Sequence, residues 1–326
     1  MLQSVVIPKE RLVTQLLSPL ASLFLLIGVG LFVRWRNILP RDATVAVFNA
    51  AVINLALPAS TFLGLARIPR LSRELLVVPL IAFIVIGVSG LIASQVARWL
   101  RLRRPTAGAL VITSMCGSTG FFGAPLFQEL SKQTGYTETL GIHAFYSEIG
   151  TLLPLLTVVV LVASYYGEGQ RWSWSNALKG LFRFLPFIAL LLGLLFWPET
   201  HGERFPAVIT ATLGFLQSAT VMLSMVALGM TITVRDFSQY LRSVVSVNII
   251  KLVIGPLVAL GLALLFGLGE QARFVVVIDS AIPAILIAIA YSGQYKLDVE
   301  FASTAVFATF LLSPITLLIW AALVRI

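Results

Sequence analysis

Residues 116–125 read Cys116-Gly-Ser-Thr-Gly-Phe-Phe-Gly-Ala-Pro125, and this stretch lies inside a long apolar segment. Three glycines stand among small polar side chains, and a proline ends the stretch. Glycine lowers helix stability, and proline deletes a backbone donor and clashes with the preceding turn. We therefore expect an apolar helix to open here. Within a membrane, open backbone is tolerated only where it lines a cavity or is buried in protein.

A second and sparser break, Asp279-Ser-Ala-Ile-Pro283, lies in a later apolar segment. Two breaks at corresponding places in two inverted halves indicate a binding site near the middle of the membrane, because the exposed N-termini of the half-helices carry partial positive charge that suits an anion. The alternative is a glycine-packed helix interface with an ordinary proline kink. We favour the site, with these substrate-binding candidates: Gly117, Ser118, Thr119, Gly120, Pro125, Ser280, Pro283 and Asn54.

The composition is that of a membrane protein. The 326 residues are 58% hydrophobic and 11% charged, whereas a soluble domain is about 25% charged. The formal net charge is +9, but the Lys and Arg residues lie between apolar runs rather than on one patch, which argues against nucleic acid as a partner. The single cysteine, Cys116, excludes an intramolecular disulfide. Two histidines without paired spacing predict no metal site, and no cofactor is expected.

Ten apolar segments are long enough to be membrane-spanning helices, which need about 20 residues each. The first is too long for the core of a signal peptide. The predicted spans are 12–33, 43–66, 75–96, 105–128, 139–166, 181–197, 206–233, 243–268, 274–291 and 301–324.

An internal repeat organises these spans. Spans five and ten align by their prolines, Pro154 and Pro314. Five spans per copy is an odd number, so the second copy enters the membrane from the opposite face. We expect an all-α integral membrane protein of ten transmembrane helices in two inverted five-helix repeats, with helices 4 and 9 broken. The repeats are residues 1–166 and 181–326, and residues 167–180 form a central cytoplasmic loop. Chance alignment of apolar helices is the alternative.

The Lys and Arg distribution predicts that both termini lie outside the cell. No glycine-rich loop with Lys and Ser/Thr is present to hold a nucleotide. We also find no paired catalytic constellation, so the chain is predicted not to be an enzyme. Transport driven by an existing gradient is what these features favour.

Four ionisable residues lie inside predicted spans: His143, Glu148, Lys251 and Asp279. A charge at the bilayer centre costs roughly 2.5–3.5 kcal/mol on insertion scales, so each needs water, a partner or a function. We hypothesise that Glu148 carries a proton or binds a cation, and the alternative is a structural pair with Lys251. Lys251 either attracts an anionic substrate or pairs with Asp279 or Glu148. Asp279, one turn before Pro283, is a candidate for ion coupling, and His143 is interpreted as a packing residue.

The stretch Gly120-Phe-Phe-Gly-Ala-Pro125 resembles the glycine-rich, proline-ended crossover of the auxin efflux carrier family, which includes plant PIN proteins and bacterial malate or malonate permeases. The C-terminal stretch Leu312-Ser-Pro-Ile-Thr-Leu-Leu-Ile-Trp320 is similar to the last helix of that family. The resemblance implies a crossover at Pro125 and Pro283, external termini, homodimers, and organic anions moved by an elevator-like shift. The family often has Asn where this chain has Ser118, which offers fewer hydrogen-bonding groups.

We therefore expect a secondary transporter of a small organic anion, a carboxylate, in the plasma or inner membrane. It would act by uniport efflux or with proton coupling, and its partners would be the anion, membrane lipid and a second copy of the chain. A sodium-coupled symporter of the bile-acid type is one alternative. A membrane sensor without transport is another.

Overall fold

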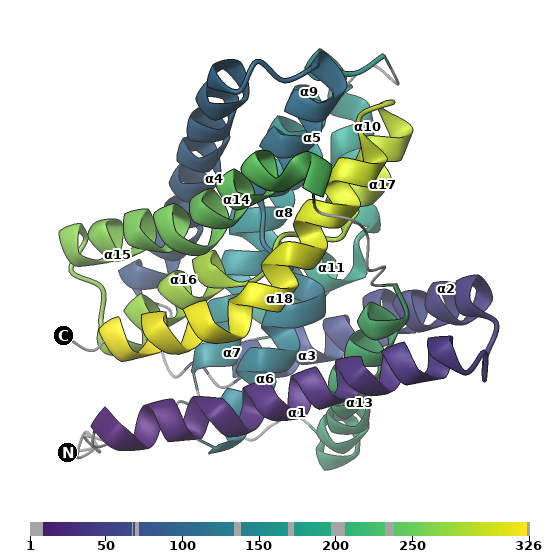
Figure 1. Ribbon diagram of the computed structural model, residues 1–326. Coiled ribbons are helices and arrows are strands. Elements are labelled where there is room, and N and C mark those ends of the chain that lie inside the picture. The colour runs from purple at the N-terminus through teal and green to yellow at the C-terminus, as the bar shows by residue number, and fades with distance from the viewer. Residues whose placement is uncertain are drawn as a thin grey trace.

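The computed structural model describes residues 9–66, 68, 72–133, 138–168, 173–196, 206–231 and 238–324. All regular elements among these residues are helices (Figure 1). Seven helical segments are long and apolar enough to cross a membrane, so the protein is a multi-pass helical membrane protein. They are Leu17–Trp35, Arg41–Ala66, Arg73–Trp99, Thr139–Tyr166, Ala207–Thr231, Leu241–Leu265 and Val299–Leu323.

The first half of the chain contains α1 to α9 and four π-helical turns, written η. They are α1 (Lys9–Trp35), α2 (Arg41–Ala51), η1 (Val52–Ala56), α3 (Leu57–Ala66), α4 (Arg73–Trp99), α5 (Arg104–Met115), η2 (Thr119–Gly123), α6 (Ala124–Gln133), α7 (Thr139–Ala144), η3 (Phe145–Thr151), α8 (Leu152–Pro154), η4 (Leu155–Val159) and α9 (Val160–Tyr166).

The second half follows after α10 (Trp174–Arg183). It contains α11 (Leu185–Leu195), α13 (Ala207–Thr231), the 3-10 turn η5 (Ser238–Tyr240), α14 (Leu241–Ile249), the π turn η6 (Ile250–Ile254), α15 (Gly255–Leu265), α16 (Glu270–Ala281), α17 (Ile287–Gln294) and α18 (Val299–Leu323).

Three predicted spans differ from simple long helices. The fourth consists of α5, η2 and α6, and the ninth consists of α16 and α17, so the expected interruption of both is confirmed. The sixth is the short helix α11. Its 11 residues extend about 16 Å, roughly half the hydrocarbon thickness of a bilayer.

The segment 167–180, predicted as a loop, is partly helical. Helix α10 begins at Trp174 and continues to Arg183, so it includes the end of this segment and the start of the predicted sixth span. Phe184 has an extended backbone (φ −82°, ψ 102°) and separates α10 from α11. Residues 169–172 of the predicted loop lie outside the described residues.

Three π turns share a cause, which is a proline two residues after the turn. The residue just before the proline donates its amide five residues back: Leu57 to Val52, Ala124 to Thr119 and Gly255 to Ile250. Proline has no amide hydrogen and crowds the carbonyl four residues earlier, so the hydrogen-bond ladder shifts by one residue. The sequence thus builds a local distortion into spans two, four and eight.

The helices pack in two groups. The first group is α1, α2 to α3, α11 and α13, with α1 running along α13 and α11 along α3. The second group is α4 to α9 together with α14 to α18. In Figure 1, α1, α2 and α13 lie along the lower side of the view and α4, α14 and α15 lie above them. The groups meet where α3 packs on α7 and α1 packs on α6 and α18.

Phe122 joins the two groups at their contact. Its ring is fully buried and packs edge-on against Phe24 of α1 and Phe310 of α18, with centroids 6.1 and 5.8 Å away. Edge-to-face aromatic pairs of this kind add about 0.5–1.5 kcal/mol beyond the burial of their area. Since Phe122 belongs to η2, this contact fixes the start of the half-helix that follows the break in span four.

Candidate functional site

The two broken helices open by the same change of backbone conformation. Helix α5 ends at Met115, and Cys116 is extended (φ −113°, ψ 144°). Helix α16 ends at Ala281, and Ile282 is extended (φ −64°, ψ 158°). Both extended residues are buried, so the backbone polar groups that each break frees must find partners inside the protein.

The two breaks pair with each other. Gly117 faces Ala284 in an isolated antiparallel β-bridge. Two backbone hydrogen bonds flank it: Ser118 N–H to Pro283 O at 2.9 Å, and Ile285 N–H to Cys116 O at 3.0 Å. We call residues 116–118 and 282–285 the helix crossing. The crossing uses freed backbone groups of one break to satisfy those of the other.

Glycine is required at position 117 by the close approach of its neighbours. A Cβ atom there would lie 2.7 Å from Cγ1 of Ile282 and 3.2 Å from Nζ of Lys251. The first distance is shorter than real Cβ contacts allow, so a side chain at this position would have to displace the buried side chain of Ile282.

Two side chains complete the crossing from neighbouring helices. The buried ammonium of Lys251 donates to the carbonyl of Ser280 at 2.6 Å, and the hydroxyl of Thr309 accepts from the amide of Ala284 at 3.0 Å. A cation near the carbonyl end of a helix interacts favourably with its partial negative charge. Lys251 therefore caps the open end of α16, and its hydrogen bond goes to backbone rather than to the carboxylate of Asp279.

Asp279 pairs with His143. Nδ1 of His143 lies 2.9 and 3.0 Å from the two carboxylate oxygens, and both side chains are buried. The imidazole stacks on Phe127 with centroids 4.9 Å apart. Gly123 makes room for it, because a Cβ there would lie 2.8 Å from Cε1 of the ring. The sequence interpretation of His143 as a packing residue missed this partner. The available signal was that ionisable side chains inside membrane spans need one.

Hydroxyl groups gather beside the crossing. Ser147 donates to Thr119 at 3.0 Å, and the hydroxyls of Tyr146 and Ser280 lie 2.9 Å apart. Within the described part of the chain, the Ser118 hydroxyl makes no hydrogen bond although the residue is 1% exposed. Ser118 directly precedes η2 and α6, where amides at the start of a helix lack partners within the helix.

Glu148 is also buried, 4% exposed, and its Oε2 has no hydrogen-bond partner among the described residues. It belongs to η3, which packs on α4 and reaches η2. The alternative of a pair with Lys251 is not what the described residues show, because the hydrogen bond of Lys251 goes to Ser280.

The remaining predicted residues stand at different distances from the crossing. Gly120 is half-buried in η2, and a Cβ there would lie 3.3 Å from a methyl group of Leu57. Pro125 lies inside α6, so the first break is centred on Gly117 and not on this proline. Asn54 is exposed and its amide donates to the carbonyl of Ala50 at 2.8 Å, one turn earlier in the same segment. No contact described here brings Asn54 to the crossing.

Many membrane transporters bind their substrates where interrupted membrane helices meet beside buried polar groups. The comparisons with known proteins agree. The profile of the membrane transport protein family matches residues 15–169 and 173–321. The chain therefore belongs to this family, which is the auxin efflux carrier family.

Two relatives cover nearly the whole chain. An uncharacterized transporter of Methanocaldococcus jannaschii is 24% identical over 300 residues, which is 91% of this chain and 94% of the relative. An uncharacterized transporter of Methanothermobacter thermautotrophicus is 27% identical over 302 residues, which is 92% of this chain and 95% of the relative.

Proposed function

We propose that this protein is a secondary transporter that binds a small organic anion, a carboxylate, at the helix crossing. The observation that carries the proposal is the unpartnered hydroxyl of Ser118, buried where one broken helix resumes. A helix N-terminus attracts an anion through its free amides and partial positive charge. A hydroxyl beside those amides adds a donor for a carboxylate oxygen.

The chain would cross the membrane ten times in two inverted repeats. Support comes from the exchange of contacts between halves. Span one packs on span seven (α1 on α13), and their counterparts in the other half, spans six and two, also pack together (α11 on α3). Span four packs on span ten (α5 on α18), and their counterparts, spans nine and five, pack in the same way (α16 on α7). Two copies related by a two-fold axis would produce such exchanged pairs. The antiparallel pairing of Gly117 with Ala284 fits a position on that axis.

Transport would proceed by an elevator-type movement. Lys251 and Thr309, which complete the crossing, and His143, which pairs with Asp279, all belong to the second helix group. A movement of the crossing through the membrane would therefore carry this group as one body along α1, α3 and α13 of the first group. The first group would remain fixed, and we propose that it forms the interface of a homodimer.

Energetics set the direction. Moving one charge through 100 mV is worth about 2.3 kcal/mol, so with the inside negative an organic anion leaves the cell downhill by uniport. Accumulation would need a coupled cation. Glu148 is the candidate proton carrier, since its carboxyl group is buried with an oxygen that has no partner among the described residues, on the element η3 that reaches η2. Asp279 and Lys251 would then contribute to coupling, because their hydrogen bonds set the position of the C-terminal end of α16. We place the protein in the plasma or inner membrane, with both termini outside.

Reconstitution in proteoliposomes tests the function. A panel of radiolabelled mono- and dicarboxylates is offered with and without proton and sodium gradients, and protein-free liposomes set the background. Uptake or efflux of a carboxylate above background is expected. If no carboxylate moves, the proposal is wrong, and if uptake needs sodium, the bile-acid type of symport replaces it.

Ser118→Ala tests the site itself. A hydrogen bond to a charged group contributes about 1.5–3 kcal/mol, so we expect transport efficiency to fall about tenfold or more. Ser218→Ala is the matched control, because the exposed hydroxyl of Ser218 donates only to the Gly214 carbonyl of its own helix. Equal transport by the two variants would remove Ser118 from the site.

A further inference from the structure

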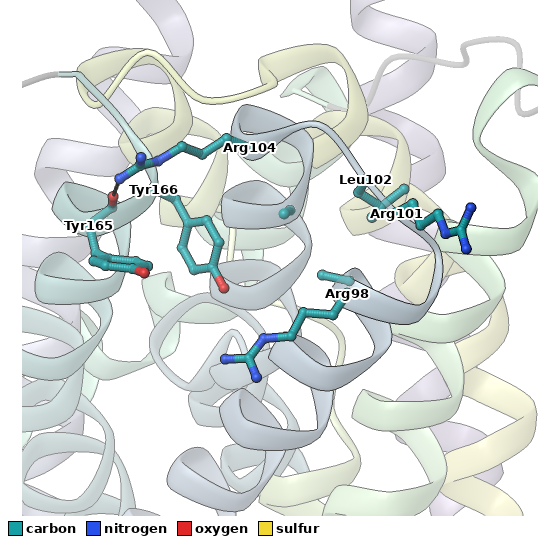
Figure 2. Close-up of a pocket in the computed structure, with 8 residues that line it drawn as sticks. Arg98, Arg101, Leu102, Arg104, Tyr165 and Tyr166 are labelled. Atoms are coloured by element: carbon teal, nitrogen blue, oxygen red, sulfur yellow. Dashed lines mark hydrogen bonds between the residues drawn. The ribbon is translucent and has the colours of Figure 1, made fainter.

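A basic cleft lies at one end of the second helix group, away from the crossing. Its volume is about 480 Å³, and it opens between the end of α4, the start of α5 and the end of α9. Its lining includes Arg98, Arg101, Arg104, Tyr165 and Tyr166 (Figure 2). The crossing begins 12 residues after the start of α5, which corresponds to about 18 Å along a helix. The cleft is therefore a separate place in the protein.

Two guanidinium groups approach this cleft from different elements. Figure 2 shows Arg104 above and Arg98 below the ring of Tyr166, while the guanidinium of Arg101 points away. Arg104 is held in place, since it donates to the backbone carbonyl of Tyr165 and lies over the Tyr165 ring, 5.4 Å from its centroid. Arg98 is exposed and makes no ion pair within the described ranges.

Two acidic residues lie close to the cleft in the chain, Glu168 after α9 and Asp298 before α18, and neither forms a salt bridge with the arginines of the cleft among the described residues. Asp298, whose amide bonds to Pro105 at the start of α5, already accepts hydrogen bonds from Thr106, Tyr240 and the amide of Phe301. Two arginines with a tyrosine hydroxyl between them form a donor set that fits the oxygens of a phosphate group.

The surroundings distinguish a lipid phosphate from a soluble one. Trp99 and Tyr165 are 74% and 69% exposed at the helix ends, as expected of aromatic residues at a membrane–water boundary. Below Arg98 on the same face of α4, two turns earlier, Leu91 is 74% exposed. Leu161, one turn before Tyr165 on α9, is 43% exposed. Apolar surface thus continues from the basic cleft towards the membrane interior on both helices.

We propose that this cleft binds the phosphate headgroup of an anionic phospholipid. Arg98 and Arg104 contact the phosphate oxygens, the hydroxyl of Tyr166 donates to one of them, and the acyl chains lie along the exposed leucines of α4 and α9. A bound lipid would link the α4–α5 connection to the end of α9, because both line the cleft. The proposal concerns lipid binding and holds or fails independently of the transported substrate.

Native mass spectrometry of the delipidated full-length protein tests this proposal. Phosphatidylglycerol, phosphatidylcholine or inorganic phosphate is titrated into the protein in neutral detergent, and bound adducts are counted. Arg98→Gln is the principal variant, because Arg98 makes no hydrogen bond or ion pair that the fold requires within the described ranges. A matched control is Arg36→Gln, which removes an equal charge from an exposed arginine lying over the ring of Trp35 at the end of α1.

We expect phosphatidylglycerol to bind more tightly than phosphatidylcholine. Each basic residue near an anionic headgroup contributes about fivefold in affinity, so Arg98→Gln should weaken phosphatidylglycerol binding about fivefold and the Arg98→Gln/Arg104→Gln double variant about thirtyfold. Arg36→Gln should leave it within about twofold. Equal binding of the two lipids, or unchanged binding by Arg98→Gln, would overturn the site. Inorganic phosphate that displaces the lipid at micromolar concentration would overturn the assignment to lipid.

Discussion

Substitution of Gly117 by alanine tests whether the crossing is as tight as its geometry indicates. The added methyl group would lie 2.7 Å from Cγ1 of Ile282, whereas ordinary contacts begin at 3.4 Å, so an ordinary contact requires a separation 0.7 Å larger. Ile282 is fully buried, and its own break is bonded to residues 116–118. Overpacking a tight interior costs about 1–3 kcal/mol. We expect the apparent melting temperature to fall by about 2–6 °C.

The assay pairs thermal unfolding in detergent with carboxylate transport in proteoliposomes. Gly87→Ala is the matched control, because a Cβ at Gly87 meets nothing within 4 Å and alanine is favoured inside a helix. It should unfold at the wild-type temperature or slightly above, and it should transport normally. Gly117→Ala should transport more slowly even below its melting temperature. If the two variants behave alike in both measurements, the breaks do not press on each other as described, and the crossing loses its place in the mechanism.

Three further substitutions test the surrounding contacts. Trp320→Phe removes the donor that its indole N–H supplies to the carbonyl of Leu252 at 2.8 Å; the cost should be about 1–3 kcal/mol in thermal unfolding, whereas the exposed Trp99→Phe should cost almost nothing. Gly123→Ala places a methyl group 2.8 Å from a carbon of the imidazole in the buried histidine–aspartate pair, so it should also destabilise the protein, and an unchanged melting temperature would contradict this packing. Glu148→Gln keeps the shape of the side chain without its charge; transport should lose its dependence on a proton gradient, and a variant that still responds to the gradient would exclude the proton-carrier role.

The placement of the breaks could be predicted from the sequence because glycine and proline act locally. A helix is weakened locally by the glycines and the proline of residues 117–125, and another by Pro283. Both helices are interrupted close to these residues. The centre of the first break was harder to predict. Pro125 is accommodated by a π turn and stays helical, so the break lies at Gly117, where the second broken helix pairs with the first.

Partners of the buried polar groups could not be predicted, since they depend on which spans become neighbours. Pro256 implies that the carbonyl of Leu252 lacks its helical donor, and this follows from the sequence alone. That the donor is the indole of Trp320, 68 residues further along, follows only from the packing of α18 on η6. His143 and Asp279 meet across 136 residues by the same means.

The same distinction applies to Lys251, for which the sequence leaves open an anionic substrate or a pair with Asp279 or Glu148. Charge alone favours a carboxylate partner, and Asp279 lies one residue before the group that Lys251 contacts, which is the carbonyl of Ser280. Asp279 is already paired with His143, and the last carbonyls of α16 have no donor within that helix. The buried ammonium of Lys251 donates to one of these carbonyls and so caps the end of α16. Its side chain also lies next to Gly117, so Lys251 holds the end of α16 at the point where the two broken helices pair.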